Sequence, residues 1–289
     1  MNIFIVGCEG QLGSSLQKSL RQRGWAVTGF SRRDLDITEL PAVESLIVNH
    51  KPDVIINAAA YTAVENAEGD PADANVVNNL AVRNLAKVAH KINALLIHFS
   101  TDYVFNGEKQ QPYVESDNTD PINVYGKTKL AGEKAIAEET DRYYIIRTSW
   151  LFSGSGNNFV TKMLSLLSSS AELNVVNDQQ GGPTYVGDLA DVVVNILQSS
   201  SEHPIPWGIY HYGGYPFVSW YDFAAYIQAE LPGASACVLR AVTSDGYPSR
   251  VKRPLNSSLD SSRLTSLLAI APSDWQQAVK AIVAQEVRL

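Results

Sequence analysis

Three glycines spaced three residues apart follow the first apolar run of the chain and precede an amphipathic run. Gly7, Gly10 and Gly13 separate the apolar segment 3–6 from residues 11–23, where leucines recur at helical spacing. A glycine turn between a strand and a helix lets backbone N–H groups approach a pyrophosphate at the positive end of the helix. The turn therefore predicts a dinucleotide-binding α/β sheet, although a turn that merely needs glycine has the same pattern.

The first half of the chain alternates short apolar runs with longer amphipathic ones, which is typical of a parallel sheet covered by helices. The expected strands are residues 3–6, 25–30, 54–56, 95–99 and 143–147, and the expected helices are 11–23, 40–49, 72–92 and 121–138. Asp70-Pro71 and Asp120-Pro121 each supply a cap and a first-turn proline for the last two helices.

Beyond Trp150, glycines and prolines are scattered among shorter elements, with helices expected over 186–198, 217–231 and 274–287. We therefore expect a Rossmann-like, doubly wound parallel sheet with a smaller, interleaved C-terminal substrate lobe. Residues 1–150 form the expected dinucleotide domain, with a contribution from about 173–200, and residues 151–289 form the expected lobe.

The residues after the second expected strand bear on the choice of nicotinamide cofactor. An acidic residue there would hold the ribose hydroxyls, whereas an arginine can receive a 2′-phosphate. The strand runs into Ser31, Arg32 and Arg33, which favours NADPH, with NADH as an alternative; solvated surface charges would also explain the arginines. Asp36 and Ile37 are expected to border the adenine.

Tyr125 and Lys129 lie four residues apart and therefore share one helix face. A tyrosine hydroxyl donates a proton poorly near neutrality unless its anion is stabilised, and a nearby ammonium supplies that stabilisation. Thr101 ends the fourth expected strand, at the edge where such sheets bind ligands, and is placed to hold a carbonyl oxygen beside the tyrosine. His98 and His211 sit in strand-like patterns and are interpreted as core or edge residues.

Further motifs cover nearly the whole chain. They are GCEGQLG (7–13), PDVIINAAAYTAVENAE (52–68), STDYVF (100–105), PINVYGKTKLAGE (121–133), RTSWLF (147–152), GNNF (156–159), NDQQGGPT (177–184) and RPLNSSLD (253–260). With these motifs the chain resembles the extended short-chain dehydrogenase/reductases and, within them, the dTDP-4-dehydrorhamnose reductase family. The motifs of the second half separate that family from the superfamily at large.

The resemblance implies that NADPH delivers hydride to the C4 ketone of dTDP-4-dehydro-L-rhamnose, giving dTDP-L-rhamnose for cell-surface polysaccharide precursors. Tyr125 would donate the proton, Lys129 would tune it and hold the ribose, and Thr101 would orient the carbonyl oxygen. The implied cofactor residues are Gly7, Gly10, Gln11, Leu12, Gly13, Ser31, Arg32, Asp36, Ile37, Ala58, Ala59, Ala60, Tyr125 and Lys129. The implied substrate residues are Asp102, Tyr103, Trp150, Asn158, Gln180 and Arg253. Structural roles are the alternatives to these binding roles: the alanines would only pack tightly, Trp150 would fill the core, and Arg253 would hold the fold.

Charge and composition limit the classes of partner that this chain can bind. With 30 acidic and 23 basic side chains the net charge is -7, which argues against a nucleic acid partner. Two cysteines make no disulfide framework, and neither a secretory signal nor a run of roughly 20 apolar residues is apparent, so we expect a cytoplasmic protein without membrane contact. We expect a monomer or weak homodimer. A metal-bridged dimer known in the family is doubtful because Ser15 and Gly187 occupy the matching ligand positions, although Asp188 is adjacent.

Three other functions compete with ketone reduction. Dehydratases of this fold carry an acidic residue after Thr-Asp, where this chain has Tyr103. A nucleotide-sugar epimerase would retain its cofactor through turnover. A non-catalytic regulatory subunit, resembling that of methionine adenosyltransferase, would not need the Thr101, Tyr125 and Lys129 set.

Overall fold

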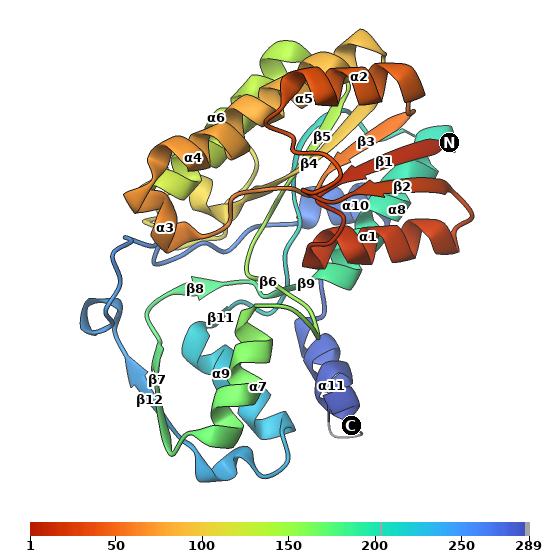
Figure 1. The fold of residues 1–289 in the computed structure, drawn as a ribbon. Helices are drawn as coiled ribbons and strands as arrows, with labels where there is room; N and C mark the ends of the chain where they lie inside the picture. Colours follow the sequence, from red (N-terminus) through yellow and green to blue (C-terminus); the bar gives the residue numbers. More distant parts are fainter. Residues whose placement is uncertain (203, 287–289) are drawn as a thin grey trace.

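Six parallel strands form the central sheet of the computed structural model, which describes residues 1–202 and 204–286 (Figure 1). The strands are β1 (Asn2–Val6), β2 (Ala26–Phe30), β3 (Val54–Asn57), β4 (Leu95–Thr101), β5 (Tyr143–Thr148) and β10 (Gly208–His211), in the order β10-β5-β4-β3-β1-β2. The order reverses beside β1, and such a reversal opens a crevice at the carboxyl ends of the strands. The predicted Rossmann-like sheet is confirmed.

Helices cover both faces of this sheet. On one face lie α1 (Gln11–Gln22), α8 (Val186–Glu202) and α10 (Ser262–Leu268), and on the other α2 (Leu40–His50), α5 (Ala81–Lys91) and α6 (Val124–Glu139) (Figure 1). Each face has its own buried cluster, because side chains alternate along the strands: Ile3 and Ile5 pack with α1 and α8, whereas Phe4 and Val6 pack with α2 and α5.

Of the two helix starts predicted at Asp-Pro pairs, the structure confirms one and contradicts the other. The predicted helix over 72–92 is a near-continuous run of α4 (Pro71–Asn75), a π-helical turn (Val76–Leu80) and α5, and Asp70 caps it by accepting from the Asp73 amide. The predicted start at Pro121 is wrong. Asn123, in extended conformation, accepts from the Gly126 amide at 2.8 Å, so α6 begins at Val124.

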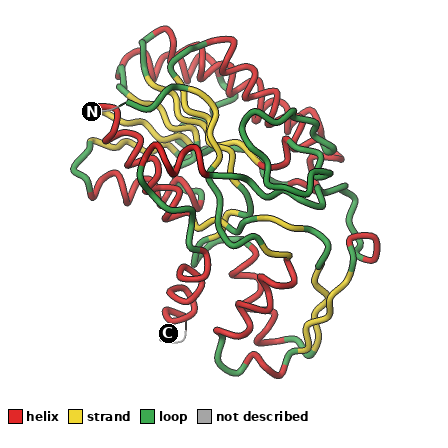
Figure 2. Tube along the Cα trace, turned by 180° about the vertical axis from the view of Figure 1, so that it is seen from behind, coloured by secondary structure: helices red, strands yellow, loops and turns green. Residues whose placement is uncertain are grey.

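A second, smaller lobe lies below the sheet in Figure 1 and is also seen from behind in Figure 2. Its helices α7 (Phe159–Ser169), α9 (Trp220–Glu230) and α11 (Trp275–Glu286) enclose an aromatic core that includes Phe152, Phe223 and Trp275. Its two-stranded pairs are β7 (Glu172–Val176) with β12 (Val238–Val242), β8 (Gln180–Gly181) with β11 (Val218–Ser219), and β6 (Leu151–Phe152) with β9 (Thr184–Tyr185). The remaining short helices are α3 (Val64–Gly69) and 3₁₀ turns at Asp102–Val104, Ala234–Ala236 and Ser244–Gly246.

The chain passes between the two lobes several times, as the interleaved prediction requires. The expected contribution of residues 173–200 to the large lobe is corrected at its start, because β7 pairs with β12 in the small lobe. Only α8 from that range packs on the sheet, and β10 and α10 also return to it. The predicted last helical residue, Val287, and the end of the predicted lobe lie outside the described residues. Of the helices described, none combines the length and apolar composition needed to cross a bilayer.

Candidate active site

The glycine turn places the start of α1 against the end of β3. Gly7 has a φ of +78°, and a Cβ on it would lie 2.7 Å from the Ala59 amide nitrogen. A Cβ on Gly13 would lie 2.2 Å from the Gly7 carbonyl oxygen. Gly10 is the N-cap of α1 and supplies no side-chain cap, which leaves the first N–H groups of the helix for another acceptor. This backbone arrangement suits a pyrophosphate.

Two exposed arginines, Arg32 and Arg33, follow the end of β2. The Arg32 side chain is 84% exposed and lies 3.4 Å from Asp36, whose pKa is lowered mainly by hydrogen bonds from Thr38. The Ser31 hydroxyl donates to Asp34 at 2.7 Å and therefore shapes the turn. Ile37 packs in the core below α2. Of these predicted cofactor residues, Arg32 is the one whose side chain reaches into solvent.

The other predicted cofactor residues border the turn through their backbones or small side chains. Ala58, Ala59 and Ala60 are half-buried at the end of β3, beside Gly7. Leu12 is buried in the core, so its side chain is structural. The Gln11 side chain accepts from Ser153 at 2.7 Å and from Asn158 at 2.9 Å. Gln11 therefore joins the glycine turn to the small lobe.

The structure brings Tyr125 and Thr101 together. Burial raises the pKa of the Tyr125 hydroxyl, and the neighbouring Thr101 hydroxyl opposes part of that rise. The Tyr103 ring meets the Tyr125 ring edge to face, with centroids 5.8 Å apart. Thr101 also donates to Asp102 at 2.9 Å, and its oxygen accepts from the Tyr103 amide at 3.1 Å. A hydroxyl pair of this kind can hold one carbonyl oxygen.

Lys129 follows Tyr125 by one turn of α6, and its amine points to β4. The Nζ atom donates to the Phe99 carbonyl oxygen at 2.7 Å and lies 3.2 Å from His98 Nε2. Burial lowers the pKa of Lys129 to about 8, while Glu133 opposes that shift. His98 was interpreted as a core residue; it is buried, and it also contacts the predicted catalytic lysine.

A buried ion pair under the same helix was missed from the sequence. Arg147 donates from Nε to Glu133 Oε1 at 2.9 Å and from Nη2 to Oε2 at 2.7 Å, and Ser100 donates to the same carboxylate. Glu133 stands four residues after Lys129, so the Tyr125, Lys129, Glu133 spacing is the signal that could have pointed to it. The pair ties α6 to β4 and β5 beneath the site.

Asp102 and Tyr103, both predicted substrate contacts, lie at the rim of this buried region. Burial raises the pKa of Asp102 to about 6, and its Oδ2 atom has no hydrogen-bond partner among the described residues. Burial raises the pKa of Tyr103 to about 12 despite the nearby charge of Arg253. The Tyr103 side chain therefore sits close to Arg253 and against the Tyr125 ring.

Arg253 is held by a carboxylate from the large lobe. Its Nη2 donates to Glu65 Oε1 at 2.9 Å, and Glu65 also accepts from the Ser249 hydroxyl and the Arg250 amide. These bonds hold the chain segment 249–253 against α3. Arg253 thus has a structural partner, and its guanidinium still lines two cavities.

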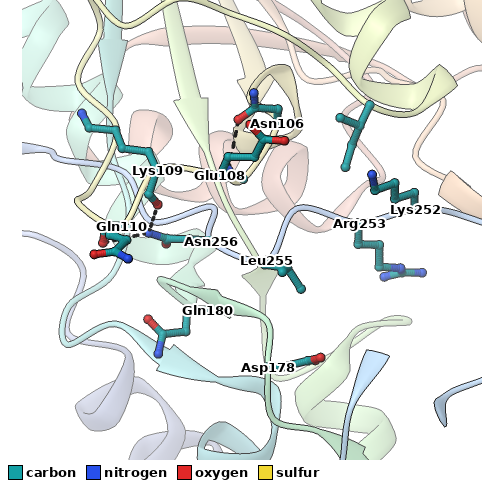
Figure 3. Close-up of a pocket in the computed structure, with 12 residues that line it drawn as sticks. Asn106, Glu108, Lys109, Gln110, Asp178, Gln180, Lys252, Arg253, Leu255 and Asn256 are labelled. Atoms are coloured by element: carbon teal, nitrogen blue, oxygen red, sulfur yellow. Dashed lines mark hydrogen bonds between the residues drawn. The ribbon is translucent and has the colours of Figure 1, made fainter. Parts of the chain in front are cut away.

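The two cavities meet at residues 252–255. The larger, of about 840 Å³, lies between α7, β7 and the segment 244–255 and includes Lys162, Trp220 and Arg250. The smaller, of about 580 Å³, contains Gln180 and has Lys252 and Arg253 at one end and Lys109 and Gln110 at the other (Figure 3). Their basic side chains suit an anionic ligand.

Trp150 and Asn158 are placed differently from the other predicted substrate residues. The Trp150 ring stacks on Trp220, with centroids 3.4 Å apart, and packs against Gly181. Trp220, which the sequence analysis did not single out, lines the larger cavity. Asn158 lines it too, but its side chain also caps α7 by accepting from Thr161 and donates to Gln11.

The structure places Ser15 and Asp188 at and beside the positions where some family members have metal ligands. Ser15 lies on α1, and Asp188 near the start of α8 accepts from the Ser273 hydroxyl at 2.6 Å. Burial raises the pKa of Asp188. Within residues 1–202 and 204–286, no three histidine, cysteine or acidic side chains gather as a metal site would require.

Comparison with known proteins gives full-length matches. The family described as RmlD substrate binding domain matches residues 1–288. A dTDP-4-dehydrorhamnose reductase of Aggregatibacter actinomycetemcomitans is 44% identical, and one of Escherichia coli K12 is 39% identical, each over 97% of this chain and at least 96% of the relative.

Solved structures agree with these matches. A dTDP-4-dehydrorhamnose reductase of Clostridium acetobutylicum superposes with a TM-score of 0.92 at 36% identity, covering 100% of both chains. One of Bacillus anthracis, solved in complex with NADP, superposes with a TM-score of 0.90 at 35% identity, covering 99% of this chain and 100% of the other. A UDP-glucose 4-epimerase of Brucella ovis, at 19% identity and a TM-score of 0.82 over 98% of this chain and 96% of that one, shares the fold alone.

Proposed function

We propose, from the premise that this chain belongs to the RmlD substrate binding domain family, that it is an NADPH-dependent dTDP-4-dehydrorhamnose reductase. It reduces the C4 ketone of dTDP-4-dehydro-L-rhamnose to dTDP-L-rhamnose, a precursor of cell-surface polysaccharides. The observation that carries this proposal is the pair of neighbouring hydroxyls, Thr101 at the end of β4 and Tyr125 at the start of α6, at the carboxyl edge of the sheet. Curated relatives at 37–44% identity over nearly their full length support the named reaction.

The residues present fit a nicotinamide dinucleotide. Glycine at positions 7 and 13 lets the turn close tightly, because a Cβ at either position would collide with neighbouring backbone, and the uncapped start of α1 suits a pyrophosphate. Arg32 is free to meet a 2′-phosphate, in agreement with the NADP complex of the Bacillus anthracis relative. When bound, this cofactor supplies the hydride.

The chain's own residues supply the proton and hold the substrate. Thr101 and Tyr125 bind the C4 oxygen, and the Tyr125 hydroxyl gives its proton to that oxygen as the C4 carbon is reduced. Because burial raises the pKa of Tyr125, the phenolate left behind needs a cation, and Lys129 is the ammonium on the same helix face.

The substrate's diphosphate is assigned to the basic cavities. Arg250 and Arg253, from the segment 249–253, and Lys162, from α7, line the larger one, and Trp220 offers a flat apolar surface there. We propose that Asp102 and Tyr103 contact the sugar, which places the deoxysugar between Tyr125 and Arg253.

We also propose a cytoplasmic enzyme, a monomer or weak homodimer, whose partner is the nucleotide sugar. Two free, buried cysteines and an acidic net charge of -7 support this environment and argue against nucleic acid. The chemistry at Thr101 and Tyr125 gives no support to the non-catalytic alternative.

Replacing Tyr125 tests the proposal. Tyr125→Phe keeps the ring but removes the proton donor, so we expect turnover of the dTDP-ketosugar to fall at least about 100-fold. NADPH binding, measured by fluorescence titration, should change little. Oxidation of NADPH is followed with wild type and variant, and the product is identified by mass spectrometry. A variant retaining more than about a tenth of the wild-type rate would contradict this role.

A further inference from the structure

The amine of Lys129 is held on the strand side of α6, where two groups of β4 contact it. The Phe99 carbonyl oxygen accepts from Nζ at 2.7 Å, and His98 Nε2 lies 3.2 Å from the same atom. Lys129 is 2% exposed and His98 1% exposed, so water does not compete for these contacts. The position of the imidazole proton therefore decides whether His98 donates a hydrogen bond to Lys129 or accepts one from it.

Asn57, at the end of β3, determines the tautomer of His98. The Ala59 amide can only donate, and it donates to Asn57 Oδ1 at 3.1 Å. The other atom of the carboxamide, Nδ2, is then a donor, and it lies 3.1 Å from His98 Nδ1. His98 Nδ1 must accept that hydrogen bond, so the neutral ring carries its proton on Nε2.

A ring with its proton on Nε2 donates to Lys129. The Nζ atom must supply a lone pair, which a neutral amine has and an ammonium lacks. Burial also disfavours the charged lysine and lowers its pKa to about 8, and a donor aimed at Nζ acts in the same direction. Burial likewise lowers the pKa of His98 well below its ordinary value, which agrees with a neutral ring.

The charged groups around Lys129 do not cancel the preference for its neutral amine. Glu133 on α6 favours the ammonium, but both its oxygens are bound by Arg147 of β5. On the 3₁₀ turn that follows β4, Asp102 accepts from the Thr101 hydroxyl, and burial keeps Tyr103 of the same turn and Tyr125 of α6 as neutral phenols.

We propose that His98 is a positioning residue: held in its Nε2–H tautomer by Asn57, it donates to Lys129 against β4 and thereby favours the neutral amine of this lysine over the ammonium in the cofactor-free protein. The lysine then gains its proton when it leaves His98 for a hydroxyl-bearing ligand such as a ribose. This step rests on the proposed function, because it makes the ammonium that stabilises the Tyr125 phenolate more favourable in the loaded site than in the cofactor-free site.

Asn57→Asp reverses the tautomer with almost no change in shape. A carboxylate accepts from both the Ala59 amide and His98, so the imidazole proton moves to Nδ1 and Nε2 becomes an acceptor for a Lys129 ammonium. Asn49→Asp, on the exposed end of α2, introduces the same charge away from the site and is the matched control.

The experiment is nuclear magnetic resonance of the cofactor-free protein labelled with ¹⁵N-histidine and ¹³C-lysine, with His98→Gln and Lys129→Met used for assignment. In the wild type and in Asn49→Asp we expect an Nε2–H ring from about pH 6 to about pH 9. In Asn57→Asp we expect an Nδ1–H ring and a Lys129 titration midpoint raised by about one unit or more. An Nδ1–H or cationic His98 in the wild type, or an unchanged Lys129 titration in Asn57→Asp, would overturn the proposal.

The pH profile of ketosugar reduction tests the consequence for catalysis. In Asn57→Asp the alkaline fall of kcat/KM should move to higher pH, whereas a merely structural effect would lower the rate equally at all pH values and overturn the positioning role. Because the resonance measurements need neither cofactor nor substrate, they report on His98 and Lys129 even if the wild type reduces no ketosugar. A missing reductase activity would contradict the proposed function instead.

Discussion

At the scale of single residues, the site depends on ionisable side chains that the fold buries. Tyr125, Lys129 and Glu133 follow one another at four-residue intervals on α6, but each meets a different group: Thr101, His98 and Arg147. The same spacing on an exposed helix would give only weak surface pairs. Burial makes each protonation state depend on its immediate partner.

Lys129→Met should stabilise the protein at neutral pH. The lysine's ordinary pKa of 10.5 falls to about 8 on folding, so the unfolded chain binds more protons between these values and wild-type stability rises with pH there. Below about pH 8 the variant escapes a burial cost of up to about 3 kcal/mol, reduced by the lost hydrogen bonds, and this gain shrinks towards pH 10. Urea unfolding at several pH values measures it.

Lys127→Met, at an exposed position of the same helix, serves as the reference variant. Equal effects of the two substitutions at every pH would show that burial of the Lys129 amine carries no such cost.

A second residue-scale prediction concerns Arg32. Its exposed guanidinium is free to pair with a 2′-phosphate, so Arg32→Ala should raise the KM for NADPH about tenfold and leave that for NADH almost unchanged. Steady-state kinetics with both cofactors decide this. Arg33→Ala is the control, and a parallel loss with NADH and NADPH would remove Arg32 from cofactor selection.

At the scale of elements, the start of α6 decides where Tyr125 lies. Asn123 caps the helix and also donates to the Lys252 carbonyl oxygen at 3.1 Å. Gly126 lets the first turn approach Tyr103, since a Cβ there would lie 2.1 Å from the Tyr103 carbonyl oxygen. Tyr125 is thus placed by a cap before it and a close contact after it.

Removing the cap should loosen that placement. Asn123→Ala is expected to lower the free energy of unfolding by about 1 to 2 kcal/mol and to reduce kcat, whereas Asn123→Asp keeps an acceptor for the Gly126 amide and should lose much less. Urea unfolding and the reductase assay measure the two effects. Equal stability of the alanine and aspartate variants would mean that the cap contributes little.

At the scale of the whole molecule, polar contacts of Gln11 and of Glu65 help to join the lobes around the site. Gln11 from the glycine turn binds Ser153 and Asn158, and Glu65 from α3 binds the segment 249–253. The contacts of Gln11 link the predicted cofactor turn to a residue that lines the larger cavity. The lobes are therefore positioned by side chains that belong to the site.

Gln11→Met tests the first of these links. The substitution preserves the length of the side chain but removes the acceptor that Ser153 and Asn158 share across the lobes, leaving them only their backbone acceptors in the small lobe. We therefore expect a loss of about 1 kcal/mol in unfolding free energy and a higher KM for the nucleotide sugar. Gln22→Met, exposed at the end of α1, is the comparison. If both variants unfold at the same urea concentration, Gln11 does not join the lobes.

Much of this architecture could be predicted from local patterns. The three-residue spacing of Gly7, Gly10 and Gly13, the strand periods and the cap at Asp70 involve neighbours in sequence, and the strands of the first half lie within a residue or two of their predictions. The Asn123 cap, after which α6 begins at Val124, could not be predicted, because Asp120-Pro121 offers the same capping residue and first-turn proline as Asp70-Pro71. The return of β10 and α10 to the large lobe has no local signal.

The sequence by itself determined the α/β sheet, the glycine turn and the residue types able to perform reduction, because these depend on periodicity and on chemistry within a few residues. Only the tertiary structure decided that Lys129 meets His98, that Arg253 is held by Glu65, and that Trp220 lines the cavity in front of Trp150. Those contacts join residues up to 188 positions apart. Their protonation and orientation follow from burial and from partners that only the packed fold brings together.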